Sequence, residues 1–336
     1  MYLIKKLFNP EIFQGRYKRK KYFEGWYFKF IDKAEKSVYA VIPGVSYGMR
    51  AEDRHAFIQV IDAVDYKSCY FKFDFSSFKY SQNDFNISIG DNTFTRNGMI
   101  LDLKREDNNE DKNKDNNEKF EIKGAIRFID IVPFPKTILS PGIMGPFTFT
   151  PFMECYHGII NIHHRITGSL SINNEIKDFT GGSGYIEKDW GRSFPESWVW
   201  IQSNHFNRDD ISVMFSMAKI PYLHMHFTGF VSFLRIGGRL YRFATYTGAK
   251  IRHFTCEDGQ IEITAVDRHY TMTISGKYRQ SGKLMAPQNG LMHREIAESI
   301  SSEIEATLQD NKGMVIFHGT GKNVGMEIVD FRVSAT

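Results

Sequence analysis

Short runs of alternating apolar and polar residues fill most of the first third of the chain. They include YFEGWYFKFID (22–32), SVYAVIPGV (37–45), HAFIQVIDAV (55–64), SCYFKFDF (68–75) and FNISIG (85–90), each bounded by turn residues. A period of two puts apolar side chains on one face of an extended strand. The pattern predicts a mainly β fold of short antiparallel strands.

Helical periodicity is scarce, and only two segments show it. Residues 137–142 form a short stretch bounded by prolines. Residues 293–306 carry Ile296, Ile300 and Ile304 at a spacing of four, which is typical of one helix face. We therefore expect few short helices, the clearest of them over 293–306.

A polar insertion, Lys104 to Glu118, has no apolar side chain and mixes both charge signs with asparagine. Such a segment cannot bury enough apolar surface to order itself. Strand alternation resumes directly afterwards, so the insertion is predicted to be the tip of a long hairpin.

An internal repeat relates the two halves of the chain. Glu24-Gly25-Trp26 resembles Glu196-Ser197-Trp198, and further matches follow at nearly the same offset. These are Ser37-Val38 with Ser212-Val213, His55 with His226, and Tyr70 with Tyr241. The repeat and the length of 336 residues predict two domains, 1–194 and 195–336, each a β-barrel or strongly curved sheet that leaves few exposed edges.

Charge and composition indicate which kinds of ligand or partner the protein binds. An aromatic fraction of 15% favours strands and a lipophilic ligand, whereas a net charge of +4 is only mildly basic. Much of the excess lies in Lys5, Lys6, Arg16 and Lys18 to Lys21. This basic N-terminal segment is interpreted first as a solvated arm, with peripheral membrane contact as the alternative. No nucleic-acid-binding motif is present, so we expect no nucleic-acid partner.

Cysteine usage and hydropathy bear on location. Cys69, Cys155 and Cys256 are isolated and odd in number, which argues against a disulfide framework and a cysteine-type zinc site. No stretch reads as a signal peptide or a membrane span. We therefore expect a cytoplasmic protein.

The segment 181–206, GGSGYIEKDWGRSFPESWVWIQSNHF, combines acids, glycines and tryptophans and is the strongest candidate site. In an extended strand, Tyr185, Glu187 and Asp189 share one face. A carboxyl group held against apolar rings keeps its proton more readily and can act as a general acid, and two neighbouring carboxylates favour this further. The alternative is a pair of acids that face solvent on a hairpin.

Further polar residues lie in strand-like segments. Glu24 is surrounded by aromatic residues in FEGWYFKF, while MECYHGIINIHHRITG supplies Tyr156 and His157. His224 and His226 have the spacing of two imidazoles on one strand face, but no motif specifies a third ligand, so we expect no metal. Motifs of serine hydrolases, P-loop enzymes, zinc proteases and dinucleotide-binding domains are absent.

Three segments together resemble the tocopherol cyclase family. They are FEGWYFKF, the segment 181–206, and LMAPQNGLMHREIAESISSEIEATL near the C-terminus. More distantly, YIEKDWG is similar to the Tyr-x-Asp-His-x-Trp-Gly segment of carotenoid hydratase-like proteins, although Lys188 stands in place of the histidine. That resemblance implies two tandem lipocalin-like antiparallel β-barrels.

The family resemblance implies a cofactor-independent cyclase that protonates a prenyl double bond and closes a chromanol ring from a prenylated hydroquinone. Glu187 or Asp189 would be the acid and Tyr185 its hydrogen-bond partner, with a hydrophobic small molecule as substrate. The expected substrate-binding residues are Glu24, Trp26, Tyr156, His157, Trp190, Trp198 and Trp200. The alternative function is binding or transport of a lipophilic ligand without chemistry.

Overall fold

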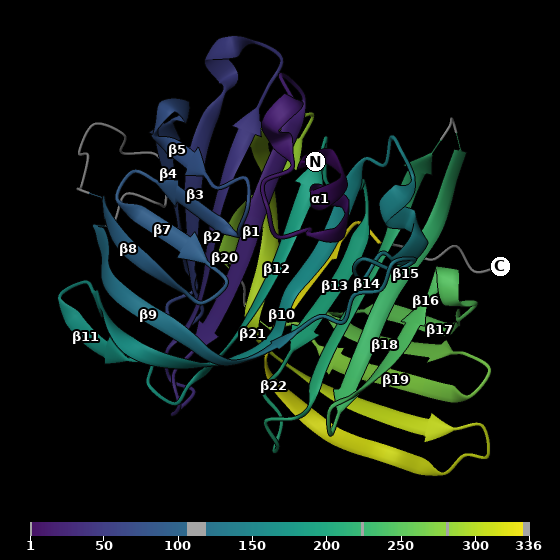
Figure 1. The fold of residues 1–336 in the computed structure, drawn as a ribbon. Coiled ribbons are helices and arrows are strands. Elements are labelled where there is room, and N and C mark those ends of the chain that lie inside the picture. Colours follow the sequence, from purple (N-terminus) through teal and green to yellow (C-terminus); the bar gives the residue numbers. More distant parts are fainter. Residues whose placement is uncertain (1, 106–118, 223–224, 280–281, 332–336) are drawn as a thin grey trace. The chain divides into compact units, whose positions relative to one another are not determined.

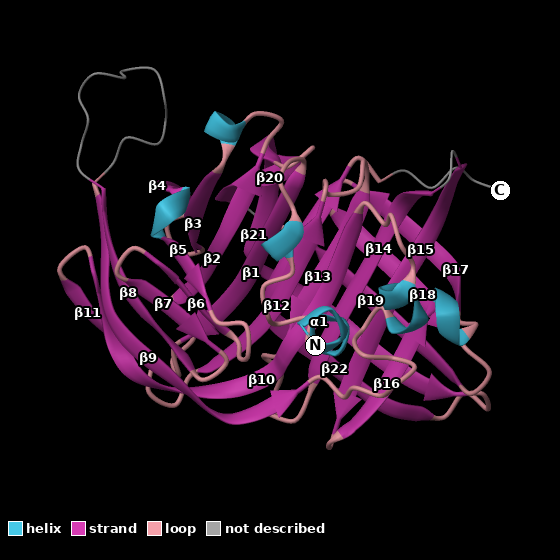
Figure 2. Cartoon of the chain, turned by 45° about the horizontal axis from the view of Figure 1, so that its top comes forward, coloured by secondary structure: helices cyan, strands magenta, loops and turns pink. Residues whose placement is uncertain are grey.

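Antiparallel strands dominate the computed structural model of the chain, which describes residues 2–105, 119–222, 225–279 and 282–331 (Figures 1 and 2). Its one α-helix in these ranges is α1 (Tyr2–Phe8). Short 3-10 helices cover Gly15–Tyr17, Ala51–Asp53, Phe75–Ser77, Gly145–Phe149 and Thr245–Thr247. The predicted fold class, mainly β with few short helices, is confirmed.

The first sheet has the strand order β4-β3-β2-β1-β12-β10-β9-β8-β7-β6-β5, with β11 paired to β10. The bounds are β1 Tyr22–Ile31, β2 Val38–Tyr47, β3 His55–Asp62, β4 Lys67–Asp74, β5 Phe78–Tyr80, β6 Asn86–Ile89, β7 Asn92–Thr95, β8 Gly98–Arg105, β9 Phe120–Pro133, β10 Cys155–Ile172, β11 Glu175–Asp178 and β12 Ser183–Gly191. Arg105 pairs with Phe120, so β8 and β9 form the predicted hairpin, whose tip at 106–118 lies outside the described residues.

The second sheet has the order β16-β15-β14-β13-β22-β21-β19-β18-β17, with β20 paired to β21. The bounds are β13 Trp198–Ser203, β14 Ser212–Tyr222, β15 Met225–Ile236, β16 Arg239–Ala244, β17 Lys250–Glu257, β18 Gln260–Val266, β19 Tyr270–Lys277, β20 Gly282–Gln288, β21 Leu291–Asp310 and β22 Val315–Val329. In each sheet the first four strands in sequence are neighbours in space, β1 to β4 in the first sheet and β13 to β16 in the second. The first of the four also pairs with the strand that comes last in the sequence of that sheet, β1 with β12 and β13 with β22.

The chain divides into two compact units. The first contains the residues up to Gly142, Cys155–Phe194 and Leu284–Glu295, and the second contains Ile143–Glu154, Pro195–Lys283 and the residues from Ile296 onward. A simple division at residue 194 would assign two short segments differently: Ile143–Glu154 belongs to the second unit, and Leu284–Glu295 belongs to the first. Each unit has its own apolar core, one built on β1 and its neighbours and the other on β13 and its neighbours.

The helix expected over 293–306 is wrong, because these residues lie inside the long strand β21. Ile296, Ile300 and Ile304 are buried. Their spacing of four is a multiple of two, so it suits one face of a strand as well as one turn of a helix. Residues 137–142 also form no helix.

Candidate active site

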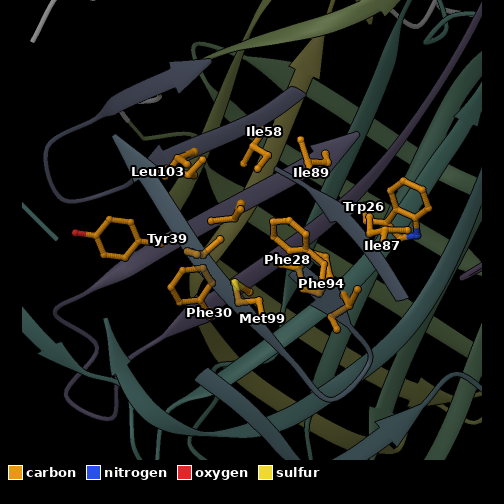
Figure 3. Close-up of a cluster of buried hydrophobic side chains, with 14 of the residues drawn as sticks. Trp26, Phe28, Phe30, Tyr39, Ile58, Ile87, Ile89, Phe94, Met99 and Leu103 are labelled. Atoms are coloured by element: carbon orange, nitrogen blue, oxygen red, sulfur yellow. The ribbon is translucent and has the colours of Figure 1, made fainter. Parts of the chain in front are cut away.

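The strand β12 presents two different chemistries on its two faces. Its register with β1 pairs Lys188 with Trp26 and Glu187 with Tyr27. Trp26 belongs to the core of the first unit, shown in Figure 3, so Lys188 lies on the core side of the sheet. Tyr185, Glu187 and Asp189 therefore share the opposite face.

On that face the three side chains meet His157 from β10, which pairs directly with Asp189. The Tyr185 hydroxyl donates to Glu187 Oε2 at 2.6 Å. His157 Nδ1 lies 2.9 Å from Asp189 Oδ1, and His157 Nε2 lies 3.6 Å from Glu187 Oε2. We call these four residues the carboxylate–histidine cluster.

The cluster is largely shielded from solvent, and its electrostatics reflect this. Burial alone lowers the pKa of His157, but the charges of Asp189 and Glu187 and the hydrogen bond to Asp189 outweigh burial and raise it to about 9. The imidazole is therefore protonated at neutral pH and bridges the two carboxylates. Burial, the charge of Glu187 and the hydrogen bond to it raise the pKa of Tyr185 well above its ordinary value, so the phenol stays neutral.

The two acids differ in access. The side chain of Asp189 is 23% exposed and that of Glu187 is 6% exposed. Asp189 is thus the acid of the cluster that a substrate or water reaches more easily, while Glu187 lies deeper, with the hydroxyl of Tyr185 on one of its oxygens.

On the core side, Lys188 forms a fully buried ion pair with Glu24, at 2.5 Å. The ammonium also donates to the carbonyl oxygens of Pro10 and Ile12, at 2.7 and 2.6 Å. Burial lowers the pKa of Lys188 to about 8, although the charge and hydrogen bond of Glu24 oppose this. With three acceptors for its three N–H groups, Lys188 serves the structure of the core.

Glu24 fastens the N-terminal segment to this pair. Its carboxylate accepts the backbone N–H groups of Gln14 and Gly15, at 2.8 and 2.9 Å, and the hydroxyl of Tyr22 at 2.5 Å. These contacts of Glu24 all lie on the core side of the sheet or in the segment before β1. Sequence reasoning expected Glu24 among the substrate-binding residues, and the structure puts it on the face of the sheet opposite the carboxylate–histidine cluster.

Three of the expected aromatic residues lie on the same core side as Glu24. The indole N–H of Trp26 donates to Glu11 O at 2.8 Å, and Lys188 Nζ lies 4.5 Å from the centre of its ring. Trp190 stacks on Tyr156 with ring centroids 5.6 Å apart and packs against the core. Lys188 Nζ also lies 5.0 Å from the centre of the Trp190 ring, so both indoles lie beside Lys188 and not on the face of Glu187 and Asp189.

Trp198 and Trp200 lie on β13 in the second unit. Val199 and Ile201 belong to the core of that unit, so the alternating tryptophans are on the other face of β13. The indole N–H of Trp198 donates to Glu327 Oε2 at 2.5 Å. Trp26 and Trp198, which match in the sequence repeat, thus face opposite ways relative to the cores of their own units.

Two register shifts interrupt the pairing of β10 with β12, one between Ile159 and Asn161 and one between Asn161 and His164. Asn161 and His164 are completely buried, and the amide nitrogen of Asn161 donates to Arg96 O at 3.2 Å. Burial lowers the pKa of His164 well below its ordinary value, so this imidazole is neutral. Because of these irregularities, a simple alternation of side chains between the two faces does not hold along β10 beyond Ile159.

A metal ion has one candidate set of ligands among the described residues. One ligand atom from each of His157, Glu187 and Asp189 lies within 4.8 Å of the others. Carboxylate oxygens and an imidazole suit a divalent cation. Such an ion would have to displace the proton that His157 holds at neutral pH. His224 lies outside the described residues, and His226 is exposed. The absence of a metal stays a prediction.

The family model described as "Tocopherol cyclase-like" matches residues 108–329. The chain belongs to this family. The match includes both β10 and β12, which carry the carboxylate–histidine cluster.

Two curated relatives of this tocopherol cyclase-like chain match over short stretches. The chain is 28% identical over 102 residues to a probable chloroplastic tocopherol cyclase of Oryza sativa subsp. japonica, and 34% identical over 71 residues to the chloroplastic tocopherol cyclase of Zea mays. The matches cover 29% and 21% of this chain, and 22% and 14% of those proteins.

Solved structures share the fold at low sequence identity. A protein from Nitrosomonas europaea has a TM-score of 0.53 at 13% identity, over 92% of both chains. CghA has a TM-score of 0.53 at 10% identity, over 93% of this chain and 90% of that one. Kievitone hydratase from Nectria haematococca has a TM-score of 0.50 at 9% identity, over 91% and 88%. The tocopherol cyclase-like chain thus has the lipocalin-like fold of these neighbours. None of its described helices is long and apolar enough to cross a membrane.

Proposed function

We propose that the chain is a cofactor-independent cyclase, which closes a chromanol-type ring from a prenylated hydroquinone or a related isoprenoid. The family supports the reaction class. The observation that carries the proposal is the carboxylate–histidine cluster, in which two carboxylates, one imidazolium and one phenol meet in a largely buried place.

The enzyme donates one proton to the substrate and takes one proton back before the product leaves. An acid O–H bond breaks as a C–H bond forms at the prenyl double bond, which leaves a tertiary cation. The phenol oxygen of the substrate then forms a C–O bond to the cation, and its proton returns to the carboxylate. Substrate and product are isomers, so the step consumes no oxidant, reductant or second substrate.

The residues divide this work according to access and charge. Proton donation leaves two carboxylates beside one imidazolium, and their single net negative charge lies next to the developing cation. Asp189 is the proton donor in this proposal because it is the more exposed acid. His157 holds both carboxylates in place, and Tyr185 fixes Glu187. An anionic cluster also stabilises the developing cation.

The test is turnover of a prenylated hydroquinone followed by mass spectrometry, with binding measured separately by quenching of tryptophan fluorescence. Loss of a general acid typically costs about a hundredfold to ten thousandfold in rate. We expect Asp189→Asn to lose turnover in this range while it still binds the substrate. The matched control is Glu175→Gln, an exposed acid on β11 of the same unit.

Unchanged product formation by both Asp189→Asn and Glu187→Gln contradicts the acid mechanism. Native protein that retains prenylquinols tightly but converts none of a panel contradicts the enzyme and favours a lipid-binding protein.

A further inference from the structure

Positive charge is concentrated in the N-terminal segment of the first unit. Residues 1–23 contain seven of the 43 basic residues and one of the 39 acidic ones, so the rest of the chain has a net charge of −2 against +4 for the whole. The one acid, Glu11, is buried and forms ion pairs with Arg96 and Lys136. It therefore does not neutralise the basic residues near it in sequence.

Four of these basic residues form an exposed loop. Residues 16–20, here called the basic loop, are all exposed and comprise Arg16, Tyr17, Lys18, Arg19 and Lys20. Lys5 and Lys6 of the same segment are less exposed than these four residues. The ammonium of Lys6 also contacts Gln14 O at 3.4 Å.

The basic loop is fixed at both ends by the core below it. At its start, the N–H groups of Gln14 and Gly15 bind the buried carboxylate of Glu24. At its end, the N–H of Lys21 donates to Gly48 O at 3.0 Å. A Cβ on Gly15 would lie only 2.4 Å from the ring of Tyr22, so the chain passes too close to the core for a larger residue. The loop is thus held in one conformation before it meets a partner.

One aromatic residue lies within this positive surface. Tyr17 is 61% exposed, and the guanidinium of Arg16 lies over its ring, 5.4 Å from the centre. Tyrosine beside lysine and arginine is typical of the membrane–water interface, where the ring and the charges both reach the headgroups. The guanidinium also occupies a ring face that stacking on a nucleic-acid base would use.

We propose that the basic loop is a docking surface for an anionic lipid bilayer. The four charges meet the negative headgroups and Tyr17 enters the interfacial layer. Each basic side chain near such a surface contributes roughly fivefold to partitioning, so four of them contribute roughly several hundredfold at low salt. Docking here is a property of the surface alone and does not depend on the proposed reaction.

The test is co-sedimentation of the full chain with phosphatidylcholine vesicles that contain or lack phosphatidylserine, without substrate. We expect binding only with phosphatidylserine and a fall in binding as salt rises. The variant Arg16→Gln, Lys18→Gln, Arg19→Gln, Lys20→Gln should lose roughly several hundredfold in partitioning at low salt. Its control removes the same charge from other exposed sites of the first unit, with Lys33, Lys36, Lys72 and Lys79 each changed to glutamine.

Equal loss in the two quadruple variants overturns the proposal, because it would show that only net charge matters. Equal binding to vesicles with and without phosphatidylserine overturns it as well, and so does an oligonucleotide that binds the loop more tightly than the vesicles do. Turnover of detergent-dispersed substrate separates the two proposals: the basic-loop variant should keep it, whereas Asp189→Asn should not.

Discussion

His157 Nδ1 lies 2.9 Å from Oδ1 of Asp189, between directly paired residues of the neighbouring strands β10 and β12. The pair joins two segments that are well separated in sequence and gives the carboxylate–histidine cluster its positive charge. Several properties of the protein should depend on this contact.

The pH dependence of stability should report on His157. Its folded pKa of about 9 exceeds the ordinary 6.5, so its contribution is complete below pH 6.5 and is lost as the pH rises through 9. The shift corresponds to on the order of 3 kcal/mol. Urea unfolding between pH 6 and 10 should show this fall for the native chain and a flatter profile for His157→Asn. The exposed His253 provides the control His253→Asn, and an identical slope in native protein and His157→Asn contradicts the assignment.

Tyr185→Phe should reduce both stability and turnover. The change removes a buried hydroxyl that donates to a carboxylate, an interaction worth about 1.5–3 kcal/mol. The matched control is Tyr70→Phe, another hydroxyl in the first unit, which contacts His55 Nε2 at 2.7 Å. Thermal unfolding and turnover should be measured on both. If Tyr70→Phe lowers turnover as much as Tyr185→Phe does, the effect of Tyr185 is only structural.

Lys188→Met should destabilise the first unit strongly. The substitution leaves the buried carboxylate of Glu24 without its cation, and breaking a buried pair on one side costs about 3–5 kcal/mol. Lys33→Met, at an exposed site, should change the free energy of unfolding by less than about 0.5 kcal/mol. Chemical denaturation measures both, and a Lys188→Met protein as stable as the native one would refute the buried ion pair.

The strand assignment of β21 has its own test. Ile304 is almost fully buried, whereas the neighbouring Glu303 is half-exposed and pairs with Arg279 at the surface. Ile304→Ala should cost about 2–5 kcal/mol and Glu303→Ala at most about 1 kcal/mol. Comparable costs for the two would conflict with alternating burial along β21, as measured by denaturant unfolding.

Local alternation carried most of the information that the sequence held about this fold. It predicted the strands and put Tyr185, Glu187 and Asp189 on one face of β12, because side-chain direction in a strand depends only on parity. It failed over 293–306, where a spacing of four satisfied both periods.

The partners of these residues could not be predicted in the same way. The pairing of His157 with Asp189, and of Lys188 with Glu24, depends on the register between strands far apart in the sequence, which local patterns do not specify. The positions of the tryptophans could not be predicted from local patterns either. Trp26 and Trp190 were expected to line the site, but they lie on the core side of the sheet.

The two-faced strand β12 also constrains how this segment can vary. Deleting or inserting one residue between Tyr185 and Asp189 would move the side chains beyond that point to the opposite face of the strand. An acidic side chain would then point into the apolar core, or Lys188 would point away from Glu24. Side chains in the segment can therefore be exchanged more readily than its length can change. Alignments of divergent relatives should show no gaps in this stretch, even where few of its residues are identical.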